Sequence, residues 1–248
     1  MTDIANLYIQ HPEIYDSFSN DRDFLTQSNT LLKVSNHEGN ATSVMELFAG
    51  PARHSFAFRN LGCRVYSLDS SEGMKRFAIE KGFQERKNYI VERLPTVIKL
   101  SEKISIFTLL RFSVGYLNKN EIRKVIEWCK GNSNSNAKLF IEIHKPSVMS
   151  SAMDKLEISQ REFNTEIGHV KCKWPSNPPI WSTLSWEVTM PIDIEVEGVK
   201  YEFSSREMIH SFEDIKDIAI SCGCHTELIA SDKLLGFNSD SLVVTVSL

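Results

Sequence analysis

The sequence predicts an α/β fold built around one mostly parallel sheet. Between residues 41 and 146, short apolar segments typical of buried strands alternate with helical segments, and this alternation is typical of βαβ units. The chain has 248 residues, of which 42% are hydrophobic. This is enough to form one large core. We therefore expect residues 1–248 to form a single domain.

The elements are expected to follow one another evenly along the chain. Helical spacing of apolar side chains is found in residues 1–40, 53–61, 71–81 and 118–130, and again from about Ser205. Seven strands are expected, at 43–48, 63–68, 89–91, 104–110, 139–144, 226–230 and 242–246. The polar tract 131–136 consists of Gly, Ser and Asn, and it predicts a surface loop between two elements.

Residues 147–204 differ from the rest, because alternating residues and Trp–Pro pairs replace the βα pattern. Glu197 and Gly198 are typical of a hairpin turn, so we expect an antiparallel β insertion that lies over the sheet as a lid. Its Trp174, Trp181 and Trp186 could line a ligand pocket or anchor the lid. After it, Ser211–Asp214 is a capping-box pattern for a helix in the closing segment, residues 205–248.

Composition excludes several classes of function. The chain carries 28 basic and 32 acidic residues, a net charge of −4, which argues against a broad nucleic-acid surface. No apolar run approaches the ~20 residues of a membrane span, and the first residues lack signal-peptide features. We therefore expect a cytoplasmic protein that binds neither nucleic acid nor membrane. We expect no metal either, because the Cys222–Cys224 pair lacks a second pair.

The first strand, turn and helix carry the strongest functional signal. Ala49, Gly50 and Ala52 form a turn of small residues before the helix, so a ligand can approach the backbone and the free N–H groups of the helix. Asp69 ends the second strand 19 residues after Gly50. A carboxylate at this place can accept hydrogen bonds from ribose hydroxyls. The alternative role for Asp69 is an N-cap of the next helix.

These segments resemble the class I S-adenosylmethionine (SAM)-dependent methyltransferases. Glu46 stands where the family's motif I acid lies, Gly50 matches the central glycine, and Ala52 and Phe48 replace the last and first glycines. A nicotinamide enzyme fits less well, since a pyrophosphate needs all three glycines. Three further segments resemble parts of the family. Leu68–Met74 is similar to its second-strand acid and the helix start that follows, and Phe112–Leu117 is similar to the segment that lies by the transferred methyl group. Ile14–Phe18 is similar to its N-terminal lid helix.

The resemblance implies a Rossmann-like, seven-stranded sheet with helices on both faces, and SAM as the cofactor. It divides the chain into an N-terminal helical lid (1–40), a cofactor-binding core (41–146), a substrate-lid insertion (147–204) and a C-terminal helix with closing strands (205–248). The sequence departs from the family at Arg93 and Ser105, where two acidic residues are usual. The expected cofactor-binding residues are Tyr15, Glu46, Ala49, Gly50, Ala52, Asp69, Ser70, Met74 and Arg93.

The candidate catalytic residues follow the fourth and fifth parallel strands, where ligands of open α/β sheets bind. Arg111 could bind an anionic substrate group or form a structural ion pair. His144 could act as a base or only end its strand. Tyr116 lies in the segment that resembles the methyl-transfer region.

The resemblance implies methyl transfer from SAM to a small-molecule acceptor, with nitrogen the favoured target. The alternative is a catalytically degenerate protein of the same fold that acts as a binding or partner subunit. The charge balance disfavours nucleic-acid and protein acceptors.

Overall fold

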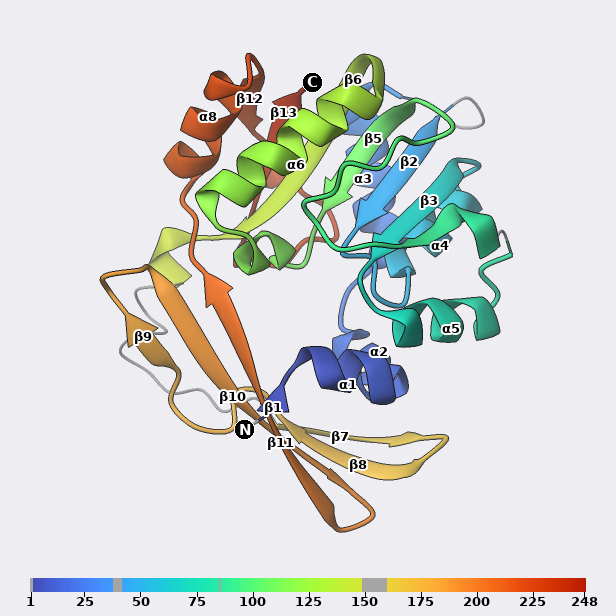
Figure 1. Cartoon of the computed structure of the whole chain (residues 1–248), viewed down its shortest axis with the longest axis vertical. Helices are drawn as coiled ribbons and strands as arrows, with labels where there is room; N and C mark the ends of the chain where they lie inside the picture. The colour runs from blue at the N-terminus through green and yellow to red at the C-terminus, as the bar shows by residue number, and fades with distance from the viewer. Residues whose placement is uncertain (1, 38–41, 85, 149–159) are drawn as a thin grey trace.

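Two β-sheets organise the chain, with short helices between them (Figure 1). The structure is a computed structural model and describes residues 2–37, 42–84, 86–148 and 160–248. Part of the expected insertion, residues 149–159, lies outside the described residues.

The larger sheet has seven strands in the order β12-β13-β6-β5-β2-β3-β4. Strands β2 to β6 run parallel to one another, and β13 is antiparallel to both β6 and β12. This confirms the expected seven-stranded, mostly parallel sheet. The strands are β2 (Ser43–Leu47), β3 (Arg64–Asp69), β4 (Tyr89–Val91), β5 (Ile104–Leu109), β6 (Ser133–His144), β12 (His225–Leu228) and β13 (Ser241–Ser247).

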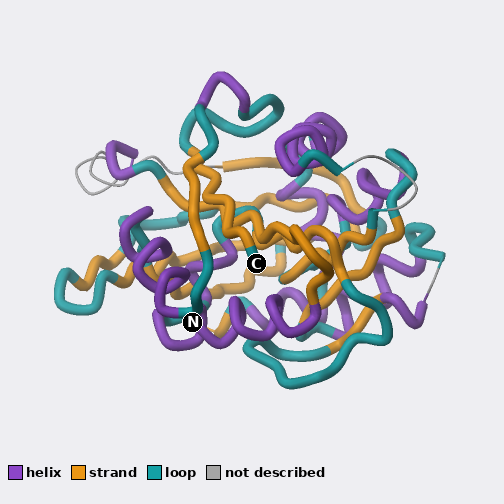
Figure 2. The backbone as a smooth tube through the Cα atoms, turned by 90° about the horizontal axis from the view of Figure 1, so that it is seen from above, coloured by secondary structure: helices purple, strands orange, loops and turns teal. Residues whose placement is uncertain are grey.

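Helices cover both faces of this sheet, as Figure 2 shows from above. On one face α6 (Lys119–Asn132) and α8 (Phe212–Ser221) bury apolar side chains against Met45, Leu47 and Phe107. On the other face α3 (Phe24–Ser35), α4 (Arg53–Asn60) and α5 (Glu72–Glu80) pack on Val44 and Ile106. Successive residues of β2 thus enter opposite cores, which is the alternation that a strand buried on both faces requires.

The second sheet has six strands and is mostly antiparallel. It consists of β7 (Gln160–Thr165), β8 (Gly168–Lys173), β9 (Ile180–Ser182), β10 (Glu187–Val196), β11 (Val199–Met208) and β1 (Thr2–Asp3). The expected turn at Glu197 and Gly198 is confirmed, with both residues at positive φ. An antiparallel unit after the core is therefore present, and the chain's own second and third residues add a parallel strand to it.

Two N-terminal helices, α1 (Ala5–Gln10) and α2 (Pro12–Ser19), lie between the two sheets (Figure 1). Leu7 and Ile14 from these helices pack against Ile192 and Phe203 of the second sheet. Short 3-10 helices complete the chain at Arg86–Asn88 (η2), Ser113–Tyr116 (η3) and Ser231–Lys233 (η4). No helix among the described residues is long and apolar enough to span a membrane.

Two expectations about local structure are wrong. The polar tract 131–136 is not a loop: α6 continues to Asn132 and β6 begins at Ser133. Two of its asparagines form hydrogen bonds inside the structure, because Asn132 bonds to Trp128 and Leu100 and Asn134 donates to the Ser105 hydroxyl.

The helix expected from about Ser205 begins instead at Phe212, behind the predicted capping box of Ser211 and Asp214. Residues 205–208 belong to β11, because they pair with β10 up to Met208 opposite Glu187. The proposed boundary at residue 204 therefore falls inside a strand.

Candidate functional site

The turn after β2 is narrow and has an unusual backbone. Phe48, Gly50 and Ala52 have φ angles of 51°, 51° and 62°, a region that residues other than glycine adopt at a cost of about 1 kcal/mol or more. Ala49 donates its N–H to the carbonyl of Leu68, and Ala52 caps the start of α4. The expected small-residue turn is therefore present, with a phenylalanine where glycine is usual.

Asp69 connects the end of β3 to this turn. Its Oδ2 accepts the N–H of Gly50 at 2.8 Å, and its Oδ1 accepts the N–H of Ser71 at 2.9 Å. Burial raises the pKa of this carboxyl. The N-cap of α5 is Ser71, whose hydroxyl accepts the N–H of Met74, so Asp69 is not the helix cap. Each of its oxygens retains a lone pair for a further donor.

Three other expected cofactor residues lie near the ends of β3 and β4. Ser70 directly follows Asp69 and is exposed. Met74 is only 1% exposed and offers no surface to a ligand in this conformation. Arg93 follows β4 and is exposed. Ser105 lies near the start of β5, where its N–H donates to the Ser43 hydroxyl, so it belongs to the opposite edge of the sheet.

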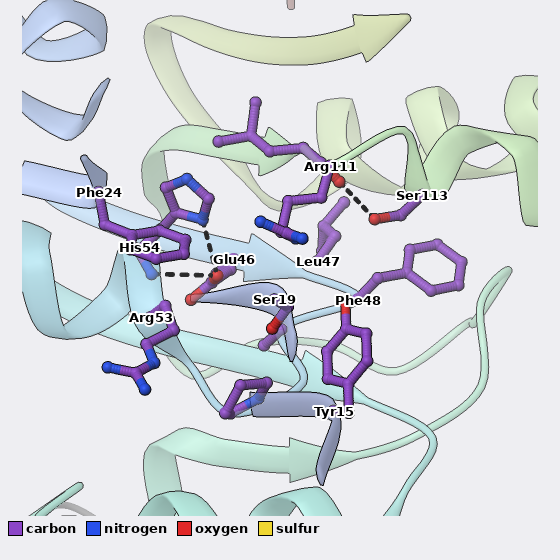
Figure 3. Close-up of a pocket in the computed structure, with 13 residues that line it drawn as sticks. Tyr15, Ser19, Phe24, Glu46, Leu47, Phe48, Arg53, His54, Arg111 and Ser113 are labelled. Atoms are coloured by element: carbon purple, nitrogen blue, oxygen red, sulfur yellow. Dashed lines mark hydrogen bonds and ion pairs between the residues drawn. The ribbon is translucent and has the colours of Figure 1, made fainter. Parts of the chain in front are cut away.

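Glu46 is turned toward the start of α4 (Figure 3). Its Oε2 accepts the N–H of Ser55 at 2.8 Å, and its Oε1 accepts the N–H of His54 at 3.3 Å and faces His54 Nδ1 at 3.2 Å. His54 Nε2 lies 2.8 Å from the Oε1 of Gln27. The carboxylate therefore stabilises the helix start, where a negative charge is favourable, and it forms part of the wall of a small cavity.

Tyr15 covers the turn from α2. Its Cε1 lies 3.5 Å from the position that a Cβ on Gly50 would take. Between Tyr15 and the turn the cavity measures about 30 Å³, which is room for about two water molecules. Figure 3 shows its lining residues, which include Tyr15, Glu46, Phe48, His54 and Arg111.

An ion pair and stacked rings hold the N-terminal helices in this position. Arg53 at the start of α4 binds Asp16 of α2 with two hydrogen bonds, Nε to Oδ1 at 2.6 Å and Nη2 to Oδ2 at 2.5 Å. Trp174 stacks on Phe18 with ring centroids 5.2 Å apart and lies 6.3 Å from Tyr15. Trp174 therefore anchors the second sheet to α2.

Arg111 forms a structural ion pair. Its Nη1 lies 3.1 Å from the Oδ1 of Asp21, and its backbone N–H donates to Glu142, which also binds Arg22 in a buried pair. Arg111 has a φ of 56°, so its backbone serves the turn after β5. Of the two roles expected for Arg111, the structure displays the ion pair.

His144 ends β6 and stacks on Phe112 with ring centroids 3.6 Å apart. Burial lowers its pKa from 6.5 to about 4, so the imidazole is neutral at neutral pH. It contributes to the wall of a large cavity of about 900 Å³ at the junction of the two sheets. Neutral histidine is a possible hydrogen-bonding partner there but a weak base.

The large cavity has the size of a site for a drug-sized ligand. Trp181 and Trp186 belong to its wall, which resolves the two roles expected for the tryptophans: these two line a pocket and Trp174 anchors. Most of its polar lining comes from the starts of α6 and α8. The lining residues are Asn118, Lys119, Asn120, His144, Pro146, Trp181, Ser185, Trp186, Met208, Ile209, His210, Ser211 and Asp214.

Tyr116 belongs to a cluster that the sequence did not reveal. Its hydroxyl lies 3.2 Å from that of Tyr8 and 3.3 Å from that of Ser205, and the Ser205 hydroxyl donates to Glu207 Oε1 at 2.9 Å. Alternation along β11 places Phe203, Ser205 and Glu207 on one face. A carboxylate on this inward face is the signal that could have identified the cluster.

Metal-binding geometry is absent from the described part of the chain, where no three His, Cys, Asp or Glu residues come together as ligands. Cys222 and Cys224 are free thiols.

No family model and no curated protein matches the sequence significantly. Solved structures do match. A SAM-dependent methyltransferase from Clostridium acetobutylicum has a TM-score of 0.71 and 15% identity, over 95% of this chain and 96% of that chain. The sugar N-methyltransferase KedS8 from Streptoalloteichus has a TM-score of 0.72 and 16% identity, over 94% and 92%.

A third similar structure is CalS10, an amino pentose methyltransferase from Micromonospora echinaspora that was solved with SAM bound. It has a TM-score of 0.64 and 13% identity, and the match covers 95% of this chain and 97% of that chain. Together with the order of the seven strands and the turn after β2, these similarities show that the chain has the class I SAM-dependent methyltransferase fold.

Proposed function

We propose that the protein transfers a methyl group from SAM to a nitrogen of a small-molecule acceptor. The observation that carries this proposal is the hydrogen bond between Asp69 and Gly50 at the carboxyl ends of β2 and β3. It joins an acidic strand end to a glycine turn at the edge where open α/β sheets bind their ligands. No other part of the described chain combines these features.

The residues of this edge fit SAM. Asp69 would accept the ribose hydroxyls through its remaining lone pairs, and Gly50 allows the cofactor to lie against the backbone. Tyr15 would cover the bound cofactor from α2, and Glu46 adds negative charge beside its cationic groups. When bound, SAM supplies an electrophilic methyl group, and the protein contributes alignment of the acceptor with it.

Binding requires α1 and α2 to move. The cavity of about 30 Å³ at the turn is far smaller than a nucleoside, and Arg53 and Asp16 hold α2 against α4. We therefore assign these helices the role of a lid that opens to admit the cofactor. The second sheet would form the other half of the enclosure, because α1 and α2 pack against it.

The acceptor would enter through the large cavity. Its volume of about 900 Å³ and its two tryptophans suit a ligand larger than an amino acid. Among the similar structures, KedS8 is a sugar N-methyltransferase and CalS10 an amino pentose methyltransferase, which supports an amino sugar as the acceptor class. His144 and Tyr116 would contact the acceptor, and Arg111 would support the turn after β5 that leads to Tyr116.

Two measurements test the proposal. Calorimetric titration with SAM and S-adenosylhomocysteine (SAH) should show micromolar binding. Radiolabelled SAM should then transfer its methyl group to members of a panel of amino sugars, but not to the corresponding sugars with a hydroxyl in place of the amine. Absence of SAM binding at millimolar concentration contradicts the proposal and favours the alternative, a partner subunit of the same fold.

A further inference from the structure

A chain of hydrogen bonds crosses from the second sheet to the N-terminal helices. It runs from Glu207 of β11 through the hydroxyls of Ser205 and Tyr116 to that of Tyr8 in α1, with separations of 2.9, 3.3 and 3.2 Å. These residues come from three elements that are far apart in the sequence. The chain therefore exists only in the folded protein.

The tyrosines of this chain border the turn after β2. The ring of Tyr116 lies 6.0 Å from the ring of Phe48, and the ring of Tyr8 lies edge-on to Tyr15 at 4.8 Å. Tyr15 in turn covers Gly50. The hydroxyl groups thus lie on the side of the turn that faces the second sheet, where an acceptor has to approach the cofactor.

Gly115 brings Glu207 close to the segment after β5. A Cβ on Gly115 would lie 3.1 Å from the carbonyl oxygen of Met208 and 3.2 Å from the Cβ of Glu207. Both distances are shorter than ordinary van der Waals contacts. The missing side chain of Gly115 therefore allows β11 to pack directly against η3, which fixes the position of the carboxylate.

The surroundings of Glu207 contain hydroxyl groups and no basic partner. Tyr8 faces it from α1, Tyr116 from η3 and Ser205 from its own strand, and its neighbour on β10 is Val188. None of the ion pairs within the described ranges includes Glu207. Burial raises its pKa from 4.5 to about 7, and the hydrogen bond from Ser205 opposes this only in part. The carboxyl group can therefore gain and lose a proton near neutral pH.

We propose that the Glu207 carboxylate binds the ammonium group of the acceptor and takes one of its protons, which makes Glu207 the catalytic base. This rests on the proposed function. The N–H bond breaks and its proton passes to a carboxylate oxygen, while the bonding electrons stay on the nitrogen as a lone pair. The lone pair forms the new bond to the methyl carbon as the methyl–sulfur bond breaks, with that electron pair left on sulfur. Tyr8 and Tyr116 would orient the amine.

The test uses two cofactor analogues, because they separate this inference from the proposed function. Sinefungin carries an amine in the region of the transferred methyl group, whereas SAH has neither a methyl group nor an amine at that position. If Glu207 faces this region, Glu207→Gln weakens sinefungin binding about tenfold to a hundredfold, the effect of losing a charge-assisted hydrogen bond, and leaves SAH binding within about twofold. Glu202→Gln, an exposed glutamate on the same strand, should change neither affinity.

Dependence on pH gives a second readout. Sinefungin affinity of the wild-type protein should rise relative to SAH as the pH passes through about 7, because Glu207 becomes charged. Glu207→Gln should remove this rise. Ser205→Ala, which deletes the partner of the carboxylate, should reduce sinefungin affinity less than Glu207→Gln does.

The results distinguish failure of the Glu207 assignment from failure of the proposed function. Equal effects of Glu207→Gln on both analogues, or no effect on either, overturn the assignment of Glu207 while SAH binding still supports the proposed function. Failure of the wild-type protein to bind either analogue overturns the proposed function and this inference with it.

Discussion

Asp69 and Gly50 are 19 residues apart in the chain, and their carboxylate oxygen and backbone nitrogen lie 2.8 Å from each other. The bond fixes the turn after β2 to the end of β3. Tyr89 of β4 adds a second tie, because its hydroxyl donates to the Gly50 carbonyl at 2.5 Å. Side chains from the two neighbouring strands β3 and β4 thus hold this glycine in place before any ligand arrives.

Asp69→Ala should reduce both cofactor affinity and stability. The substitution removes the ribose partner and leaves the N–H groups of Gly50 and Ser71 without an acceptor. We expect SAH to bind about tenfold to a hundredfold more weakly, and the free energy of unfolding to fall by about 1–3 kcal/mol. Calorimetry and urea unfolding measure the two effects. The control is Asp217→Ala at an exposed position of α8. Unchanged SAH affinity would show that Asp69 serves only the turn.

Gly50→Ala separates the local backbone requirement from the binding role of this residue. Gly50 and Gly82 have positive φ angles of 51° and 102°, and only at Gly50 would a Cβ have a near neighbour, Tyr15. Alanine at either place should cost about 1 kcal/mol of stability. Only Gly50→Ala should weaken SAH binding, because its methyl group lies on the surface that the cofactor must contact. Equal SAH affinity of both variants contradicts this placement.

The sequence was sufficient for the features that depend on local patterns. The seven strands of the sheet, the turn at Gly50 and the capping box at Ser211 each have a signal within a few residues. Asp69 was found because parallel strands place their carboxyl ends at one edge of the sheet. Its spacing from Gly50 along the chain therefore predicted that the two residues lie close together at that edge.

The sequence was insufficient to predict features that depend on contacts between segments far apart in the chain. The Tyr116 hydroxyl contacts the hydroxyls of Tyr8 and Ser205, which are 108 and 89 positions away in the chain, and no local pattern records such contacts. The tract 131–136 was misassigned for a similar reason. Its asparagines are typical of loops, but Asn132 and Asn134 form hydrogen bonds with Trp128, Leu100 and Ser105 inside the fold.

Loosening the pair of Asp16 and Arg53 should change the rates of cofactor binding more than the affinity. In the structure this pair holds α2 over the turn, and it would form again once the cofactor is enclosed. Asp16→Asn should therefore raise both the association and the dissociation rate constants of SAH. Stopped-flow measurements follow both rates, with Asp23→Asn at the cap of α3 as a control. If only dissociation accelerates, the pair stabilises the bound state alone and does not limit entry.

His144 should make the protein sensitive to acid. Burial lowers its pKa from 6.5 to about 4, so the folded protein binds this proton less readily than the unfolded chain does. The neutral ring contributes fully to stability above pH 6.5, and its contribution is lost as the pH falls from 6.5 toward 4, by up to about 3 kcal/mol. His144→Phe keeps a ring to stack on Phe112 and cannot be protonated.

We therefore expect the stability of His144→Phe relative to the wild type to increase as the pH falls from about 7 to about 4. Urea unfolding across this range measures the difference, and His225→Phe at an exposed position is the matched control. A constant difference between the His144 variant and the wild type would show that the ring is accessible enough to be protonated in the folded state. In that case His144 could act as a base near neutral pH, and the assignment of that role to Glu207 would have to compete with it.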